Sequence, residues 1–213
     1  MTELILIRHG ETLWNQQGRM QGQQDSPLTE LGVRQARQLA QRLREERFDA
    51  LYSSDLGRAY RTAVSIAEET GHAVIVDTRL RERNFGVFEG LTNADIKARY
   101  PEDHARFASR DPHYVMSGGE SAHAFQQRIV RCMSEIADNH SGANAVVVTH
   151  GLVLDALYRA ALGMPIEQPR GFPLLNCSLN TFRYEKGRWH AVSVCDVAHL
   201  EADAVTHFQG RFV

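Results

Sequence analysis

Two histidine–glycine pairs in this chain each follow a short apolar segment. Arg-His-Gly at 8–10 comes directly after the apolar run 4–7, and Thr-His-Gly at 149–151 comes directly after the apolar run 145–148. Ligands of open α/β sheets bind at the carboxyl ends of strands. If the two runs are neighbouring strands, both imidazoles lie in one crevice beside a helix N-terminus, which favours anions. The two motifs together predict an anion site, although the first one alone is equally compatible with a polar strand end.

A third segment adds another cation to this anion site. Ser-Ser-Asp-Leu-Gly-Arg at 53–58 follows a further strand candidate and places Arg58 in the first turn of the next helix. Guanidinium groups stay charged and bind phosphoryl oxygens bidentately. A neutral imidazole can attack phosphorus and form a phosphohistidine. Two arginines and two histidines around one point therefore suit phosphoryl transfer without a metal ion. Arg61 shares a helix face with Arg58, and we assign it no role.

Strands and helices alternate along the chain and must position these residues. The expected strands are 4–7, 49–53, 73–76 and 145–148, followed by a hairpin of 178–184 and 189–194. The expected helices run from Pro27 and Thr29 to about 44, from 55 to 70 with Ser54 as the cap and Gly71 at the end, from 121 to 138, and from 151 to 162. This alternation predicts an α/β fold, a three-layer sandwich with a mostly parallel central sheet and helices on both faces.

One stretch interrupts the alternation. Residues 92–119 contain two short helical pieces around Pro101, followed by Pro112 and a Gly-Gly pair at 118–119. We expect a small helical cap insertion beside the site, within a single domain that spans 1–213. An ordinary surface excursion fits the same pattern.

Composition excludes several classes of function. The chain has 213 residues, 43% of them hydrophobic, and a formal net charge of −2, so no basic field attracts nucleic acid. No apolar run approaches the roughly 20 residues that span a bilayer, and the N-terminus does not resemble a signal peptide. Three widely spaced cysteines predict neither a disulfide framework nor a zinc site. We expect a cytoplasmic protein without contact to nucleic acid or membrane.

Several ordered motifs identify a family resemblance. Arg-His-Gly-Glu-Thr at 8–12, the segment 14–29, Ser-Asp-Leu-Gly-Arg at 54–58, Leu-Arg-Glu-Arg-Asn-Phe-Gly at 80–86 and Thr-His-Gly at 149–151 follow one another in the chain. In these motifs the chain resembles the histidine phosphatase superfamily, the phosphoglycerate mutase-like proteins. The resemblance extends from about residue 4 to residue 200.

This resemblance implies the catalytic roles. His9 would be the nucleophile that becomes phosphorylated. Glu82 would give a proton to the leaving alkoxide and later remove one from water. Read without the resemblance, Glu82 fits better with a surface ion pair to Arg81 or Arg83.

The resemblance also implies the binding residues. These are Arg8, Arg58 and His150 as the permanent phosphate pocket, with Asn15, Gln21, Gly22 and Gly151 beside them. The substrate would be a small-molecule phosphate ester, and no metal ion or other cofactor is expected. A homodimer is compatible with the sequence.

The superfamily contains phosphatases and mutases, and the sequence favours a phosphatase. Mutases of this type bind a carboxylate with basic residues that include an adjacent arginine pair, and this chain has no Arg-Arg dipeptide. Phe85 and Asn93 stand where the mutases carry tyrosine and lysine, and the segments 86–92 and 118–121 resemble the phosphatase branch. We therefore expect a metal-independent phosphomonoesterase for small phosphorylated metabolites. The alternatives are a cofactor-dependent phosphoglycerate mutase and a non-catalytic phosphate-binding protein.

Two other chemistries are poorly supported by the sequence. Cys177 and Arg183 have the C-x5-R spacing of cysteine-dependent phosphatases, but the segment between them has no glycine and alternates like a strand. We expect Cys177 to be a packed core thiol. The other histidines show no metal-ligand spacing. Phe85 and Tyr114 are candidates for shaping the leaving-group side of the site.

Overall fold

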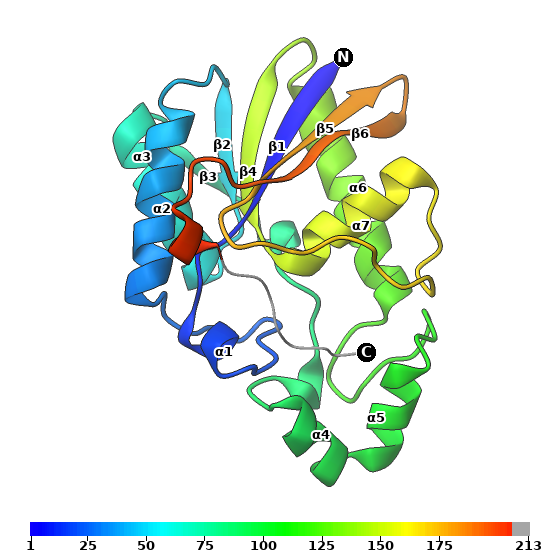
Figure 1. The fold of residues 1–213 in the computed structure, drawn as a ribbon. Coiled ribbons are helices and arrows are strands. Elements are labelled where there is room, and N and C mark those ends of the chain that lie inside the picture. The colour runs from blue at the N-terminus through cyan, green and yellow to red at the C-terminus, as the bar shows by residue number, and fades with distance from the viewer. Residues whose placement is uncertain (206–213) are drawn as a thin grey trace.

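The computed structural model describes residues 1–205, and a six-stranded sheet forms its centre (Figure 1). The strand order is β3-β2-β4-β1-β5-β6. The strands are β1 (Thr2–Arg8), β2 (Ala50–Ser53), β3 (Val74–Val76), β4 (Asn144–Thr149), β5 (Leu179–Glu185) and β6 (Arg188–Asp196). The first four are parallel, and β5 and β6 form an antiparallel hairpin that joins the sheet beside β1. The mostly parallel sheet is therefore confirmed.

Helices cover both faces of this sheet. The α-helices are α1 (Leu13–Gln16), α2 (Glu30–Leu43), α3 (Gly57–Thr70), α4 (Asn93–Arg99), α5 (Pro101–Ala108), α6 (Ala122–Asn139) and α7 (Gly151–Leu162). Three short 3-10 turns are η1 (Thr78–Leu80), η2 (Gly86–Phe88) and η3 (Ala202–Ala204). Figure 1 shows α2 and α3 on one face and α6 and α7 on the other, so the expected three-layer sandwich is confirmed.

The two faces of β1 explain why its sequence is apolar throughout. Leu4 and Leu6 pack with α6 and α7, whereas Ile7 packs with α2 and α3, and all three are fully buried. A strand that is covered on both sides reads as a continuous hydrophobic run rather than as an alternating one. This central burial holds the end of β1, and with it the first histidine motif, in a fixed place.

The start of α3 differs from the prediction. The helix begins at Gly57 with Leu56 as its N-cap, so the expected cap at Ser54 is wrong. The carboxylate of Asp25 accepts the backbone N–H of Arg58 at 3.2 Å and takes over part of the capping. The hydroxyl of Ser54 lies instead 2.8 Å from His150 Nε2. A polar group does cap the start of α3, but it belongs to Asp25. The loop after β2 directs Ser54 toward His150 instead.

The segment 92–119 carries α4 and α5, the two short helices that the pattern indicated, and Pro101 is the first residue of α5. Both helices lie together at one end of the molecule, away from the sheet (Figure 1). A third hydrophobic cluster, which includes Phe85, Phe88 and Tyr114, joins this segment to the loops below the sheet. Within residues 1–205, no helix has the length and apolar character to cross a membrane.

Candidate active site

The ends of β1 and β4 bring the two histidine motifs together. The two strands pair in parallel with Arg8 opposite Thr149, and the backbone N–H of His9 donates to the Thr149 carbonyl at 3.0 Å. The ring centroids of His9 and His150 are 5.3 Å apart, and both residues are buried. The condition set by the sequence, that the two apolar runs be neighbouring strands, is met.

The imidazole of His9 is held in one tautomer. Its Nδ1 lies 2.8 Å from the carbonyl oxygen of Gly10, which can only accept, so Nδ1 carries the proton. Nε2 therefore presents a lone pair, which accepts a hydrogen bond from Arg58 Nε at 3.2 Å. Burial, together with the charges of Arg58 and Arg8, holds the pKa of His9 well below its usual value. His9 is thus neutral at physiological pH, with a nitrogen lone pair on Nε2.

His150 lies against His9 and is fixed from behind. Its Nε2 is 2.8 Å from the Ser54 hydroxyl, which also accepts the N–H of Leu56 and can donate its own proton to the imidazole. The ring proton then sits on Nδ1, a buried atom with no hydrogen-bond partner among residues 1–205. Burial also holds the pKa of His150 well below its usual value. His150 is therefore neutral and lies directly against the ring of His9.

Arg58 is fixed by the loop that follows α1. The guanidinium donates to the carbonyls of Gly22 and Gln24, at 2.7 Å each, and to the Asp25 carboxylate at 3.1 Å. Only 1% of the residue is exposed, and burial lowers its pKa. Because its orientation is set before any ligand arrives, little reorganisation is needed when charge develops next to it.

Glu89 in turn holds the loop that holds Arg58. Its carboxylate accepts the backbone N–H groups of Phe85 and Gln23 at 2.9 Å and of Gln24 at 3.0 Å. Gly22 has a φ of +55°, and a Cβ at this position would lie 2.0 Å from Glu89 Oε1. The sequence showed Glu89 only as part of a family-like motif and gave it no role.

Arg8 completes the cationic side of the site. It is 3% exposed, and its Nη1 donates to the carbonyl of Leu174. Burial lowers its pKa to about 10, so the group stays charged at neutral pH. A Cβ at Gly151 is already in contact with this pair, at 3.2 Å from Leu174 Cδ1 and 3.6 Å from Arg8 Nε. The glycine therefore lets the start of α7 lie close to the arginine.

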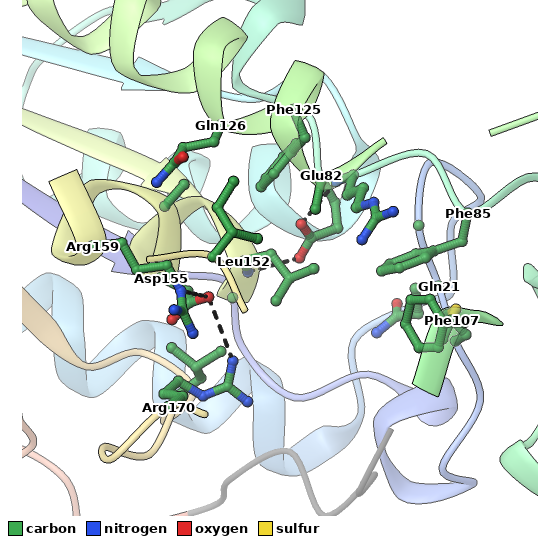
Figure 2. A pocket seen from close by; sticks show the side chains of 18 of the residues that line it. Gln21, Glu82, Phe85, Phe107, Phe125, Gln126, Leu152, Asp155, Arg159 and Arg170 are labelled. Carbon is green, nitrogen blue, oxygen red and sulfur yellow. Dashed lines mark hydrogen bonds and ion pairs between the residues drawn. The ribbon is translucent and has the colours of Figure 1, made fainter. Parts of the chain in front are cut away.

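Glu82 is buried on the other side of the site, with 9% exposed. Its two carboxylate oxygens accept the backbone N–H groups of Arg83 at 2.8 Å and Leu152 at 3.1 Å (Figure 2). Arg81 pairs with Asp55 instead, so the surface ion pair suggested by the bare sequence is wrong. Burial raises the pKa of Glu82 above the usual carboxyl range. The side chain is suited to hold and release a proton.

A single cavity of about 590 Å³ collects these groups. Eight of the nine expected site residues line it, namely Arg8, His9, Asn15, Gln21, Gly22, Arg58, Glu82 and Gly151. His150 does not line the cavity but packs behind His9. Phe85 and Tyr114 also face the cavity, as do Phe107 from α5 and Phe125 from α6 (Figure 2). The cavity has a cationic end beside His9 and an aromatic wall.

Cys177 and Arg183, which have the spacing of a cysteine-dependent phosphatase, lie outside the cavity. Cys177 is fully buried in the core, and burial raises the pKa of its thiol. Arg183 lies on β5 and pairs with Glu3. The C-x5-R reading is therefore wrong, because strand geometry replaces the phosphate-binding loop. Among the described residues, no group of three or more His, Cys, Asp or Glu side chains is placed to bind a metal ion.

Comparisons with known proteins agree on one family. The model of the histidine phosphatase superfamily (branch 1) matches residues 4–197. The probable phosphoglycerate mutase GpmB of Yersinia pestis is 37% identical, and the match covers 98% of this chain and 100% of the relative. The solved structure of Bacillus stearothermophilus YhfR is 37% identical, with a TM-score of 0.87, and the match covers 94% of this chain and 100% of that one. A phosphoserine phosphatase mutant from Entamoeba histolytica, in complex with phosphoserine, is 31% identical with a TM-score of 0.85, covering 94% and 100% of the two chains.

Proposed function

This chain belongs to the histidine phosphatase superfamily and is an enzyme of it, and on that basis we propose that it hydrolyses phosphate monoesters of small metabolites through a phosphohistidine. One observation carries the proposal. A buried, neutral His9 presents Nε2 beside the fixed guanidinium of Arg58, in the same cavity as the carboxyl of Glu82. Nucleophile, charge stabilisation and proton donor are the three requirements of the reaction.

In the first step, His9 Nε2 attacks phosphorus and the bond from phosphorus to the ester oxygen breaks. Arg8 and Arg58, which line the cavity, bind the non-bridging oxygens, whose charge grows in the transition state. His150 lies against His9, with its ring centroid 5.3 Å away, and would support it from there. Protonated Glu82 gives its proton to the departing alkoxide. The alcohol leaves, and His9 carries the phosphoryl group on Nε2 while its Nδ1–H still donates to the Gly10 carbonyl.

In the second step, water attacks the phosphohistidine from the side that the alcohol has left. The carboxylate of Glu82 takes a proton from this water as the phosphorus–nitrogen bond breaks. Inorganic phosphate leaves, and His9 and Glu82 return to their starting protonation states. One carboxyl group thus serves as acid and then as base, and no metal ion or other cofactor takes part.

The cavity also supports a coarse statement about substrates. A volume of about 590 Å³ suits a small phosphorylated metabolite, and the segment 92–119 would act as a cap on the leaving-group side. Phe85, Phe107 and Tyr114 would contact the alcohol part of the ester. We place the enzyme in the cytoplasm, where such metabolites are found.

A second candidate is phosphoglycerate mutase activity, which the name of the Yersinia pestis relative favours. A mutase returns the phosphoryl group to a bound phosphoglycerate instead of to water. Incubation with 3-phosphoglycerate separates the two: a phosphatase releases inorganic phosphate, and a mutase forms the 2-phospho isomer. We expect release of phosphate as the main reaction.

The test of the proposal is a trapping experiment on His9. Rapid acid-free quenching with a labelled phosphomonoester should capture an acid-labile phosphoenzyme in the wild type and none in His9→Ala. Turnover should be abolished in that variant while its thermal unfolding stays cooperative, and turnover of the wild type should persist in the presence of a chelator. A His9→Ala variant with near-normal activity would refute the assignment.

A further inference from the structure

The proposed proton donor, Glu82, is carried by an irregular segment of the chain. Residues 81–84 lie between the 3-10 turns η1 and η2, so neither a helix nor the sheet supplies donors for their carbonyl oxygens. Buried backbone carbonyls in such a segment require donors from elsewhere in the fold. The position of the Glu82 carboxyl in the cavity therefore depends on the contacts that fix this segment.

Arg128 on α6 supplies such donors from outside the cavity. Its Nη1 donates to the carbonyls of Arg79 at 2.7 Å and Arg81 at 3.0 Å, and its Nη2 donates to the carbonyl of Glu82 at 3.4 Å. One guanidinium thus reaches three carbonyls along residues 79–82. This suits the planar fork of an arginine better than the compact ammonium of a lysine. Arg128 itself does not line the cavity.

Glu120 joins Arg128 to the far end of the same segment. Its Oε1 accepts from Arg128 Nη2 at 2.5 Å and from the backbone N–H of Asn84 at 2.9 Å. Its own backbone N–H donates to the Asn84 carbonyl at 2.9 Å, and its carbonyl accepts from Arg83 Nε at 3.0 Å. The segment 118–121, which resembles the phosphatase branch in sequence, therefore lies against the residues that follow Glu82 and does not line the cavity.

The carboxyl end of Glu82 has fewer contacts than its backbone. Its oxygens accept the backbone N–H groups of Arg83 and Leu152. Within residues 1–205, no side chain forms a hydrogen bond or an ion pair with this carboxyl. Since the first donor belongs to the segment itself, a shift of the segment carries the carboxyl with it.

We propose that Arg128 and Glu120 are positioning residues for the proton donor, and that their ion pair fixes residues 79–84 so that the Glu82 carboxyl reaches the leaving oxygen. This inference rests on the proposed function, because it concerns the acid of that reaction. A misplacement of about 1 Å can cost about 100-fold in rate. An aryl leaving group needs little protonation, so loss of Arg128 should slow alkyl esters far more than aryl esters.

Arg128→Gln tests this role. We expect kcat/KM for glycerol 3-phosphate to fall about 10- to 100-fold, and kcat/KM for p-nitrophenyl phosphate to fall by no more than about threefold. Arg131→Gln is the matched control, because Arg131 lies on the same helix, pairs with Glu135 and has 83% of its side chain exposed. That variant should keep the wild-type kcat/KM for both esters. In the Glu82→Gln background, Arg128→Gln should cause no further loss for glycerol 3-phosphate.

A second variant disrupts the same ion pair from its other side. In Glu120→Gln the amide oxygen can still accept the N–H of Asn84, but the charge that Arg128 pairs with is lost. The ratio of kcat/KM between the alkyl and the aryl ester should fall in this variant as well. A folded Arg128→Gln or Glu120→Gln that loses the same factor for both esters would overturn the positioning role, because a general loss of structure predicts that result.

Hydrogen exchange separates this inference from the proposed function. The backbone N–H groups of Arg83 and Leu152 donate to the Glu82 carboxylate, so in Arg128→Gln they should exchange at least about tenfold faster relative to Val147, a core residue of β4. The control variant should show no such change. If the wild type hydrolyses neither ester but the exchange difference is present, the proposed function fails and the positioning role stands. If the wild type hydrolyses both esters, and Arg128→Gln changes neither their ratio nor the exchange, the positioning role fails and the proposed function stands.

Discussion

Glu89 does not line the cavity, but its carboxylate holds the loop that fixes Arg58. Glu89→Gln removes this carboxylate. The amide keeps one acceptor oxygen, which can serve Phe85 and Gln23 as Oε1 does now. Its NH2 group then faces the backbone N–H of Gln24, which Oε2 now accepts at 3.0 Å. One charge-assisted hydrogen bond is lost, at a cost of about 1.5–3 kcal/mol. The carbonyl of that same residue accepts from Arg58 at 2.7 Å, so the damage reaches the phosphate pocket directly.

The assay compares activity with stability. If the whole cost appears in the transition state, kcat/KM for p-nitrophenyl phosphate falls about 10- to 150-fold, and inhibition by vanadate weakens in parallel. The melting temperature falls by about 3–12 °C for a chain of this size. Asp49→Asn is the matched control, because its carboxylate accepts the N–H of Asn144 at 3.0 Å, outside the cavity. We expect that variant to keep wild-type kcat/KM.

A double-mutant cycle with Arg58→Ala decides whether Glu89 acts through Arg58. In the Arg58→Ala background, Glu89→Gln should change kcat/KM by no more than a few-fold, because the group it positions is gone. Two results would refute the reasoning. One is a lower melting temperature of Glu89→Gln with unchanged kcat/KM and vanadate affinity, which would restrict Glu89 to stabilising the fold. The other is an undiminished effect on kcat/KM in the Arg58→Ala background.

Three further predictions concern the acid, its titration and the packing of the first motif. Glu82→Gln should lower kcat/KM for an alkyl phosphate at least about 100-fold but far less for an aryl phosphate, whose leaving group needs little protonation; equal losses would count against the acid role. For alkyl esters kcat/KM should fall as pH rises through the raised pKa of Glu82, because the proton donor is lost. The acid limb of the pH profile should lie below the usual titration range of histidine, because the pKa of His9 is lowered. Identical alkaline limbs for aryl and alkyl esters would contradict this. Gly10→Ala should lower the free energy of unfolding by about 1–3 kcal/mol in a denaturant titration. The reason is that the alanine Cβ would lie 2.5 Å from the carbonyl oxygen of Gly32. An unchanged midpoint would show that the two backbone segments can separate.

The parts of the site that local patterns determine could be predicted from the sequence. A buried strand followed by His-Gly is a local signal, and it occurs twice, so the sequence alone predicts both histidine motifs. Their adjacency could only be stated as a condition, because strand order depends on contacts between residues about 140 positions apart. The family resemblance supplied the expected role of Glu82 as proton donor, whereas the neighbouring arginines alone suggested an ion pair.

The remaining parts depend on tertiary placement and left no local signal. Ser54 has the residue type of a helix cap, and only the approach of β4 to β2 shows that its hydroxyl meets His150. Glu89 follows a short turn, and its role requires the separate loop 22–24 to lie against it. Arg110 and Arg170 line the cavity, but they are single arginines in irregular segments, where an exposed cation is the usual expectation. The four residues of α1 are too few for a periodic pattern.

The central position of β1 determines when the site can assemble during synthesis. This strand is the first of the chain to be made, yet its partners are β4, at 144–149, and β5, at 179–185. Contacts of such long sequence separation form slowly and late. A nascent chain shorter than about 185 residues therefore holds His9 without one of the strands that flank it, and a ribosome-bound fragment ending before β5 should show no phosphatase activity. The catalytic cavity is therefore complete only when β5 has joined β1.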